Sequence, residues 1–520
     1  MPTFTGTPFD DTLFGTDRYD DIIVGFEGDD ALYGLGGNDQ LAGYDGNDIL
    51  DGGIGIDRMF GGDGNDLYMK DNVRDEMAES FDDASGGVDL VWSSVSHTLG
   101  YGFEHLALMG VANISGTGNV KDNIIEGNSG RNVLKGGLGN DTLKGGLGDD
   151  TLSGDSGDDV LEGGAGYDTA SYATAKAGVT VELGLSRAQD TGEAGIDTLM
   201  DIEYLTGSKF DDTLTNNNSL RNIRINGGAG KDLLGGDGGS GTLNGGAGDD
   251  RLGIAFGSYT LNGGAGDDVL DSLGGTATFN GGDGNDTLKA EFGTATLNGG
   301  DDNDRLKADS SKATLNGGAG DDALDSFNGT VTLNGGDGND WLTSSLDRTA
   351  TLNGGDGDDT LFASEPLIAS EGNLTLNGGD GNDEVTFESR SGHSTIDGGS
   401  GADRLGHGFH GGNPGDSTVT FDYNAVSDSL AGTGRDTIAG FTGLGAGLGD
   451  QIDLTDIDAN AMVAGKQSFI FGGPHTAGHL WYDSGFLNGN TDTDAGPEFQ
   501  IQLVGAPALS VGGPGSDILL

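Results

Sequence analysis

The chain has no cysteine, only 8 prolines and only 24 lysine and arginine residues among its 520 residues. Without cysteine no disulfide framework can form, and no apolar run reaches the roughly 18 residues of a membrane-spanning helix. The 85 acidic residues give a formal net charge of −61, so we expect no binding to nucleic acid through phosphate contacts. The 105 glycines follow no strict three-residue period, which excludes collagen.

Low hydrophobicity combined with extreme charge normally predicts disorder, because too little apolar surface is available to offset chain entropy. A folded chain of this composition therefore needs a cation to neutralise its acidic residues. Residues 1–15 have neither a basic segment nor an apolar core, so we expect no Sec-type signal peptide.

A nine-residue pattern, G-G-x-G-x-D-x-U-x with U apolar, recurs in two blocks of the sequence. Its glycines permit tight turns, and its x-U-x segment predicts a short strand whose central residue faces inward. Two such units make one 18-residue coil, so aspartates 18 residues apart stack on one edge, about 4.8 Å apart. The aspartates are Asp30, Asp39, Asp48, Asp57 and Asp66 in the first block and Asp141, Asp150, Asp159 and Asp168 in the second, where Asn132 holds the same register.

The third block differs because its acidic turn recurs only once in each 18 residues. We therefore expect aspartates on both edges of the first two blocks and on one edge of the third. The aspartates of the third block are Asp232, Asp250, Asp268, Asp286, Asp304, Asp322 and Asp340, followed at wider intervals by Asp359, Asp383 and Asp403.

Each gap between stacked turns offers carbonyl oxygens and two carboxylates, the ligand set that Ca²⁺ prefers, whereas Mg²⁺ demands a tighter octahedron. Pairing aspartates between successive coils predicts about 14 gaps and as many Ca²⁺ ions. Without the metal the stacked carboxylates repel one another by roughly 1 kcal/mol per pair even at the dielectric constant of water. We therefore expect Ca²⁺ to drive folding.

These repeats resemble those of the RTX (repeats-in-toxin) calcium-binding proteins. Six C-terminal segments are similar to the secretion domain of serralysin-type proteases, although the protease domain itself is missing: 421–430, 434–441, 450–459, 469–471, 499–503 and 517–520. The resemblance implies an all-β fold, a parallel β-roll (β-solenoid) of stacked calcium-binding coils with a C-terminal β cap. It also implies a secreted, extracellular bacterial protein that folds in extracellular calcium and leaves the cell by type I secretion, without a cleaved N-terminal signal.

We divide the chain into six segments on the basis of repeats and composition. They are β-roll block one (1–70), irregular spacer coils (71–126), block two (127–171), degenerate spacer coils (172–225), block three with its 18-residue period (226–405), and the C-terminal cap and secretion domain (406–520).

We predict a structural, surface-layer, matrix or adhesive role rather than an enzyme, because neither H-E-x-x-H nor G-x-S-x-G occurs. The predicted partners are calcium ions and the type I secretion machinery, with cell-surface polysaccharide as a further candidate. One alternative is an extracellular polysaccharide-active enzyme that uses a groove of the solenoid. Another is an ice or crystal-surface binder, because threonines such as Thr278 and Thr296 recur in outward-facing columns of block three.

Two smaller features of the sequence are its histidine pairs and an Asn-, Thr- and Asp-rich loop near the C-terminus. The histidine pairs His407/His410 and His475/His479 lie in glycine-rich sequence, so we expect surface histidines there rather than metal ligands. Alternating Asn, Thr and Asp residues in 488–494 offer oxygen ligands for one more Ca²⁺, and the sequence leaves that site open.

Overall fold

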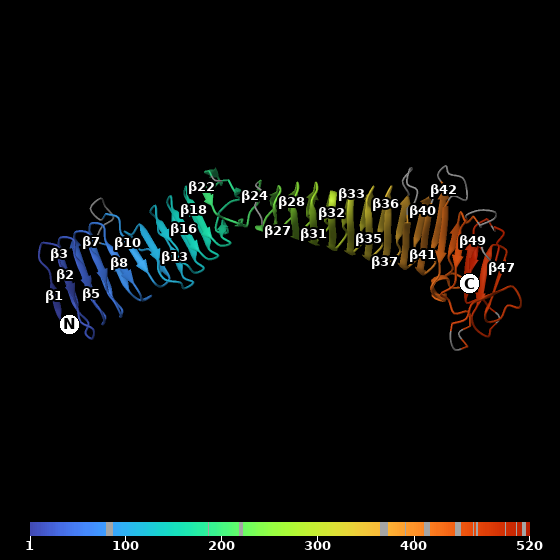
Figure 1. Ribbon diagram of the computed structural model, residues 1–520, viewed down its shortest axis with the longest axis horizontal. Coiled ribbons are helices and arrows are strands. Elements are labelled where there is room, and N and C mark those ends of the chain that lie inside the picture. The colour runs from blue at the N-terminus through green and yellow to red at the C-terminus, as the bar shows by residue number, and fades with distance from the viewer. Residues whose placement is uncertain are drawn as a thin grey trace. The chain divides into compact units, whose positions relative to one another are not determined.

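The computed structural model of the chain describes residues 1–79, 87–185, 187–217, 222–364, 373–389, 392–409, 417–442, 449–460, 462–463, 466–494, 496–505, 507–511 and 516–520. It divides into two compact units, Met1–Ala247 and Gly248–Leu520. Among the described residues there are strands and one short 3-10 helix but no α-helix (Figure 1). No helix in this part of the chain is long and apolar enough to span a membrane.

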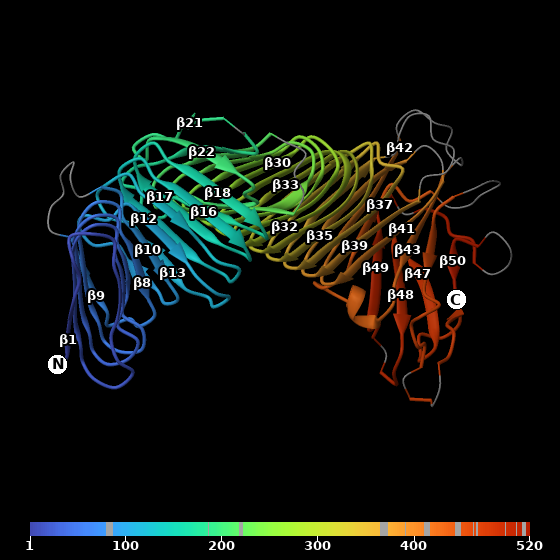
Figure 2. The ribbon, with the colours of Figure 1, turned by 60° about the vertical axis from the view of Figure 1, so that its left-hand side comes forward.

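Unit 1 is a β-solenoid in which strands one coil apart pair in parallel. Figure 2 shows the strands of this unit, coloured from blue to green. The first face comprises β1 (Thr3–Thr5), β3 (Ile22–Glu27), β5 (Gln40–Asp45), β7 (Arg58–Asp63) and β9 (Glu76–Ala78). The second comprises β2 (Thr12–Phe14), β4 (Ala31–Tyr33), β6 (Ile49–Asp51), β8 (Leu67–Lys70), β10 (Leu90–Ser93), β12 (His105–Leu108), β14 (Ile124–Glu126), β16 (Thr142–Leu147), β18 (Val160–Ala165) and β22 (Ile196–Met200), which β21 (Gln189–Asp190) joins antiparallel.

The remaining strands of unit 1 continue the same stacking beyond β9. One series comprises β11 (His97–Thr98), β13 (Ser115–Thr117), β15 (Val133–Leu138), β17 (Thr151–Ser156), β19 (Thr169–Ser171), β23 (Tyr204–Thr206), β25 (Ile223–Ala229) and β27 (Ser240–Ala247). The other comprises β20 (Thr180–Leu183), β24 (Thr213–Asn216) and β26 (Leu233–Gly236). Both spacer segments of the sequence thus form coils, since β10 pairs with β8 and β12, and β24 pairs with β20 and β26.

Unit 2 is also a parallel β-solenoid, and it ends in the β cap. Its first face comprises β29 (Ser258–Ala265), β31 (Thr276–Asp283), β32 (Thr287–Asp301), β33 (Arg305–Ala319), β35 (Thr330–Asp337), β37 (Thr349–Asp356), β39 (Asn373–Asp380), β41 (Gly392–Ser400), β43 (Ser417–Asp422), β45 (Gln451–Asp453) and β50 (Ile518–Leu519). Its second comprises β28 (Arg251–Ile254), β30 (Val269–Ser272), the first parts of β32 and β33, β34 (Ala323–Phe327), β36 (Trp341–Ser345), β38 (Thr360–Ser364), β40 (Glu384–Ser389), β42 (Arg404–Phe409), β44 (Thr437–Ala439) and β49 (Phe499–Leu503).

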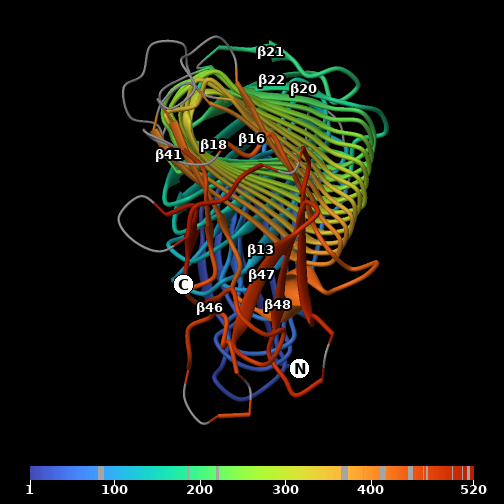
Figure 3. The same cartoon turned by 90° about the vertical axis from the view of Figure 1, so that its right-hand side faces the viewer.

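The cap adds the 3-10 helix η1 (Val426–Ser429) and the strands β46 (Ile470–Phe471), β47 (His479–Asp483) and β48 (Phe486–Asn490). The pairs β47–β48 and β48–β49 are antiparallel, in contrast to the parallel coils. Figure 3 looks from this end of unit 2, with β46, β47 and β48 in red at the front.

The core lies between the two faces of each coil. The apolar residue at the centre of each x-U-x segment is buried, as Leu270, Leu288 and Leu306 illustrate in unit 2. The coils stack in an 18-residue register, in which Thr278 pairs with Thr296 across β31 and β32. The predicted parallel β-solenoid is confirmed, because strands one coil apart pair in parallel and burial alternates along strands such as β31 as their two-residue period requires.

The threonine columns of block three do face outward in register, while the residues between them are buried. An asparagine ladder runs beside them, in which Nδ2 of Asn298 donates to Oδ1 of Asn280 at 2.8 Å. The exposed Lys312 takes a place in the outer column, where it pairs with Thr294 and Thr330.

The histidine prediction is wrong for His407. Its side chain is fully buried, and its Nδ1 lies 3.2 Å from Oδ1 of Asp450, because Asp450 returns from the cap to the last regular coil. His475 is exposed, as expected, and stacks on Trp481 with ring centroids 4.0 Å apart. His410 lies outside the described residues.

Candidate metal centre

The acidic turns stack through a repeated hydrogen bond between successive coils. The backbone N–H of Asp268 donates to Oδ1 of Asp286 at 2.8 Å, and the N–H of Asp286 donates to Oδ1 of Asp304 at 2.7 Å. Each carboxylate is therefore fixed between two coils. Because its Oδ1 is occupied in this way, only its second oxygen, Oδ2, remains to bind anything else.

The structure brings the predicted site residues together in such columns. All nineteen are buried, with at most 2% of their surface exposed. In unit 1 two columns are present, one through Asp30, Asp48 and Asp66 and one through Asp39 and Asp57. In unit 2 a single column runs from Asp250 to Asp403. The acidic turns therefore lie on both edges in the first block and on one edge in the third.

The second carboxylate oxygen distinguishes these aspartates from ordinary turn residues. In every predicted aspartate except Asp232 and Asp250, Oδ2 is buried and has no hydrogen-bond partner among the described residues. Burial raises the pKa of Asp48 and Asp304 to about 7 and that of Asp286 to about 6. Leaving a buried polar atom unpartnered costs about 1–3 kcal/mol, and more for a charged group, so each of these oxygens needs a partner.

Glycine at the first position of the nonapeptide opens the space in front of Oδ2. A Cβ on Gly281 would lie 2.1 Å from Oδ2 of Asp286 and 2.5 Å from the carbonyl oxygen of Gly299, one coil further on. A carboxylate oxygen and a carbonyl oxygen thus face the same small space. Gly263, Gly299, Gly317 and Gly335 repeat this arrangement along the same column.

These donors fit Ca²⁺. They are all oxygens, and they combine carbonyl oxygens with the Oδ2 atoms that the stacking hydrogen bonds leave unused, which is the chemistry that a hard divalent cation requires. The predicted aspartates would hold the ion from two successive coils. The positive charge of the ion would balance the negative charge of the buried carboxylates.

The structure also contains column residues that the nonapeptide pattern did not identify. Each accepts the backbone N–H of the preceding column member through Oδ1, or donates its own N–H to the next. A partial signal was available, because each is followed by x-U at the start of a strand, although the set of turn glycines before it is incomplete. These residues are Asp21, Asp89, Asp197, Asp212 and Asp436.

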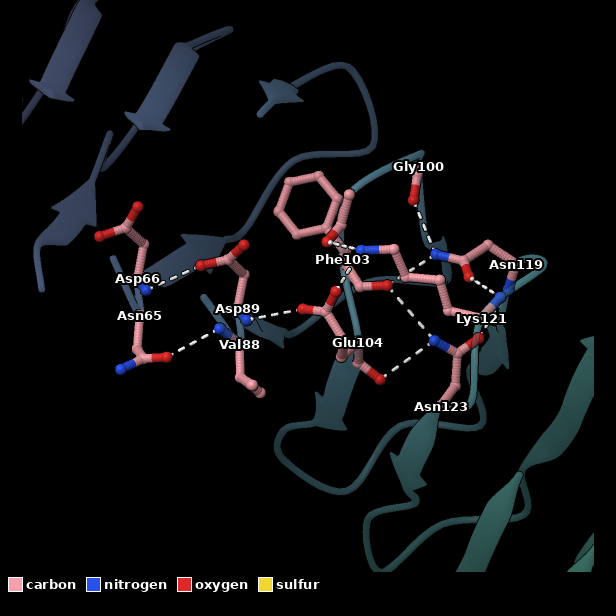
Figure 4. A network of polar contacts seen from close by, with 11 residues as sticks. Asn65, Asp66, Val88, Asp89, Gly100, Phe103, Glu104, Asn119, Lys121 and Asn123 are labelled. Atoms are coloured by element: carbon pink, nitrogen blue, oxygen red, sulfur yellow. Dashed lines mark hydrogen bonds and ion pairs between the residues drawn. The ribbon is translucent and has the colours of Figure 1, made fainter. Parts of the chain in front are cut away.

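In one stretch of unit 1, N–H groups of lysine and asparagine side chains, instead of a cation, contact oxygens of the column (Figure 4). The column continues from Asp89, whose N–H donates to Oε2 of Glu104 at 2.9 Å. Nζ of Lys121 forms an ion pair with Glu104 and also donates to the carbonyl oxygen of Gly102 at 3.1 Å. Nδ2 of Asn123 donates to the carbonyl oxygen of Glu104 at 3.1 Å. Lysine and asparagine side chains thus donate to carbonyl oxygens of this coil.

Asn132 behaves in the same way on the other edge. Its Nδ2 donates to the carbonyl oxygen of Ile114 at 2.8 Å, and its N–H still donates to Oδ1 of Asp150 at 2.7 Å. Asparagine therefore keeps the stacking of the coils while its amide takes the place of a cation.

The loop 488–494 is held by its own hydrogen bonds. Oδ1 of Asn490 accepts the N–H of Asp492, and Oδ1 of Asp492 accepts the N–H of Asp494 at 2.8 Å. These Asx turns account for the alternating residue types. The carboxylates of Asp492, Asp494 and Glu498 lie within 4.8 Å of one another.

Comparison with protein families agrees with this geometry. A family model of the RTX calcium-binding nonapeptide repeat, in four copies, matches residues 5–41, 42–69, 117–152, 136–170, 260–288, 273–306, 289–324, 351–365, 363–389 and 386–409. The chain carries RTX calcium-binding nonapeptide repeats. These RTX repeats occur in both units and include most of the aspartate columns described above. No curated protein is significantly similar to this sequence.

Proposed function

We propose that the protein is secreted and that its solenoid folds when the aspartate columns bind extracellular Ca²⁺. The observation that carries this proposal is the row of buried Oδ2 atoms without hydrogen-bond partners. About 14 bound ions would reduce the net charge from −61 to roughly −33, which relieves much of the self-repulsion of the compact state. The predicted aspartates are the proposed ligands.

Counting bound metal after equilibrium dialysis tests this proposal. We expect about 14 Ca²⁺ ions per chain at millimolar free calcium. Mg²⁺ at the same concentration should fail to replace them, because it dehydrates reluctantly and needs near-ideal octahedral geometry. Fewer than about three bound ions, or equal binding of Mg²⁺, would refute the assignment.

We propose that the folded solenoid has a structural, surface-layer, matrix or adhesive role. Each of the two solenoid units presents long regular surfaces, as repeat proteins do. A screen of the calcium-loaded chain against acidic and neutral polysaccharides tests both this role and the alternative of an enzyme. Retention without product release supports adhesion, and release of shortened saccharides would overturn the non-enzymatic role.

We propose that residues 406–520 direct export by a type I system, on the basis of their resemblance to serralysin-type secretion domains. In a bacterium that carries a type I exporter, the full chain should reach the medium. A chain truncated after residue 405 should remain inside the cell. Export of both chains would show that the C-terminal segment is not the signal.

A further inference from the structure

Three carboxylates meet where the first block of unit 1 ends. Asp66 and Asp89 follow one another in a column, since the N–H of Asp66 donates to Oδ1 of Asp89 at 2.8 Å. Glu79 reaches them from the spacer just after β9, and oxygens of all three residues lie within 4.8 Å of one another. Asp66 and Asp89 are only 2% and 1% exposed, and Oδ2 of Asp66 has no hydrogen-bond partner among the described residues.

This gap differs from the regular gaps of the same column. In the preceding gap, the space beside Gly43 is bounded by Oδ2 of Asp48 and the carbonyl oxygen of Gly61. Beside Gly61, the corresponding space is bounded by Oδ2 of Asp66 and the hydroxyl of Tyr68. A hydroxyl therefore stands where the regular gap has a carbonyl oxygen.

Tyr68 is placed there by its position in the nonapeptide. It occupies the inward-facing U position, which Leu32 and Leu50 occupy in the strands before it, and its side chain is fully buried against Phe103. Its hydroxyl accepts the N–H of Gly61 and donates to Oε1 of Glu79. Tyr68 thus fixes the carboxylate of Glu79 at the gap.

The charged neighbours of Asp66 and Asp89 are other carboxylates. No described lysine or arginine forms an ion pair with Asp66, Glu79 or Asp89. Lys121, the ion-pair partner of Glu104, also favours the charged form of Glu79. Asp66 and Asp89 therefore have no cationic side chain beside them within the described residues.

We propose that Asp66, Glu79 and Asp89 form a Ca²⁺ site of a different kind, with three carboxylates and with Tyr68 as the positioning residue for Glu79. This site deepens the proposed function, on which it rests, because it closes the first calcium block where the spacer begins. A regular gap contributes two carboxylates. The third one makes this site tighter for Ca²⁺ by about tenfold or more and favours a trivalent ion still further, since ligand charge tunes affinity.

Terbium binding to the full chain tests the site. In a chain kept folded by Ca²⁺, the first equivalent of Tb³⁺ should bind here, and its luminescence should be excited through the adjacent Tyr68. Glu79→Gln should weaken binding of this equivalent by about tenfold or more. The matched control is Glu76→Gln, because Glu76 lies three residues away, is exposed and pairs with Arg58. This control should bind as the unmodified chain does.

A second variant covers the case in which Glu79→Gln fails to fold. Tyr68→Phe keeps the packing against Phe103 but removes the hydroxyl, so we expect both weaker binding of the first equivalent and loss of the tyrosine-excited signal. Tyr33→Phe in β4 is its control. If Glu79→Gln and Glu76→Gln bind the first equivalent equally, the site is refuted while the calcium columns stand. If the unmodified chain binds no Ca²⁺ at all, the proposed function fails as well.

Discussion

Replacing Asp286 by alanine removes one carboxylate from two adjacent gaps of the unit 2 column. Oδ1 of Asp286 accepts the N–H of Asp268 at 2.8 Å, and its unpartnered Oδ2 faces the space beside Gly281. Loss of a hydrogen bond to a charged group lowers the free energy of unfolding by about 1.5–3 kcal/mol. This loss applies whether or not calcium is present.

The calcium-dependent loss is larger. A site occupied at 100 times its dissociation constant stabilises the folded state by about 2.7 kcal/mol, so two sites contribute roughly 5 kcal/mol. Asp286→Ala should therefore bind about two fewer ions. Its stability deficit, measured by urea unfolding of the full chain, should grow by roughly 5 kcal/mol between limiting and saturating calcium.

Two further variants separate the contributions. Asp309→Ala should change stability by less than about 1 kcal/mol, because Asp309 lies outside the column and forms only a partly exposed ion pair with Lys307. Asp286→Asn should lose the same ions as Asp286→Ala yet be more stable at the same calcium concentration, since Asn132 shows that an amide fits this position. Equal calcium losses in Asp286→Ala and Asp309→Ala would refute the register of the column.

Three other predictions follow from the same geometry. Gly281→Ala should reduce calcium binding, because its Cβ would lie 2.1 Å from Oδ2 of Asp286. A Cβ on Gly253 would have nothing within 4 Å, so Gly253→Ala should bind calcium normally. Equal numbers of bound ions in the two variants would contradict a calcium site beside Gly281. Lys121→Met should lower the unfolding free energy by about 2–3 kcal/mol equally at limiting and at saturating calcium, because it leaves the half-buried Glu104 without its ion-pair partner; a loss seen only at saturating calcium would be contrary to this account. Burial raises the pKa of Asp48 from 3.8 to about 7, so the strand content of the calcium-free chain should fall as pH rises from about 4 to 7, while calcium affinity should rise over that range. Circular dichroism in chelator and calcium titrations at pH 5 and 8 measure both, and more strand in the calcium-free chain at pH 8 than at pH 5 would refute the assignment.

Much of the fold and site could be predicted from local spacing. Aspartates recurring every nine or 18 residues, with an apolar residue two positions later, determine the coil length, the inward residues and the edge on which each aspartate lies. The register of Thr278 against Thr296, and the stacking of Asp268 on Asp286, follow directly from that period.

The other parts of the fold and site depend on contacts between residues whose spacing no repeat in the sequence predicts. Asp66 stacks on Asp89 after 23 residues and Asp403 on Asp436 after 33, because spacer lengths vary while the column continues. Glu79 lies near Asp66 only because of the tertiary fold. Burial of His407 likewise depends on a cap residue far along the chain, so a glycine-rich setting did not imply exposure.

The central claim is that calcium folds the solenoid, and a calcium titration followed by far-UV circular dichroism tests it most directly. Bound metal should be counted at saturation on the same samples. The account predicts a transition from coil to strand in chelated protein on addition of calcium, with about 14 or more ions bound at the end. A full strand signal in excess chelator, with few ions bound at saturating calcium, would contradict it.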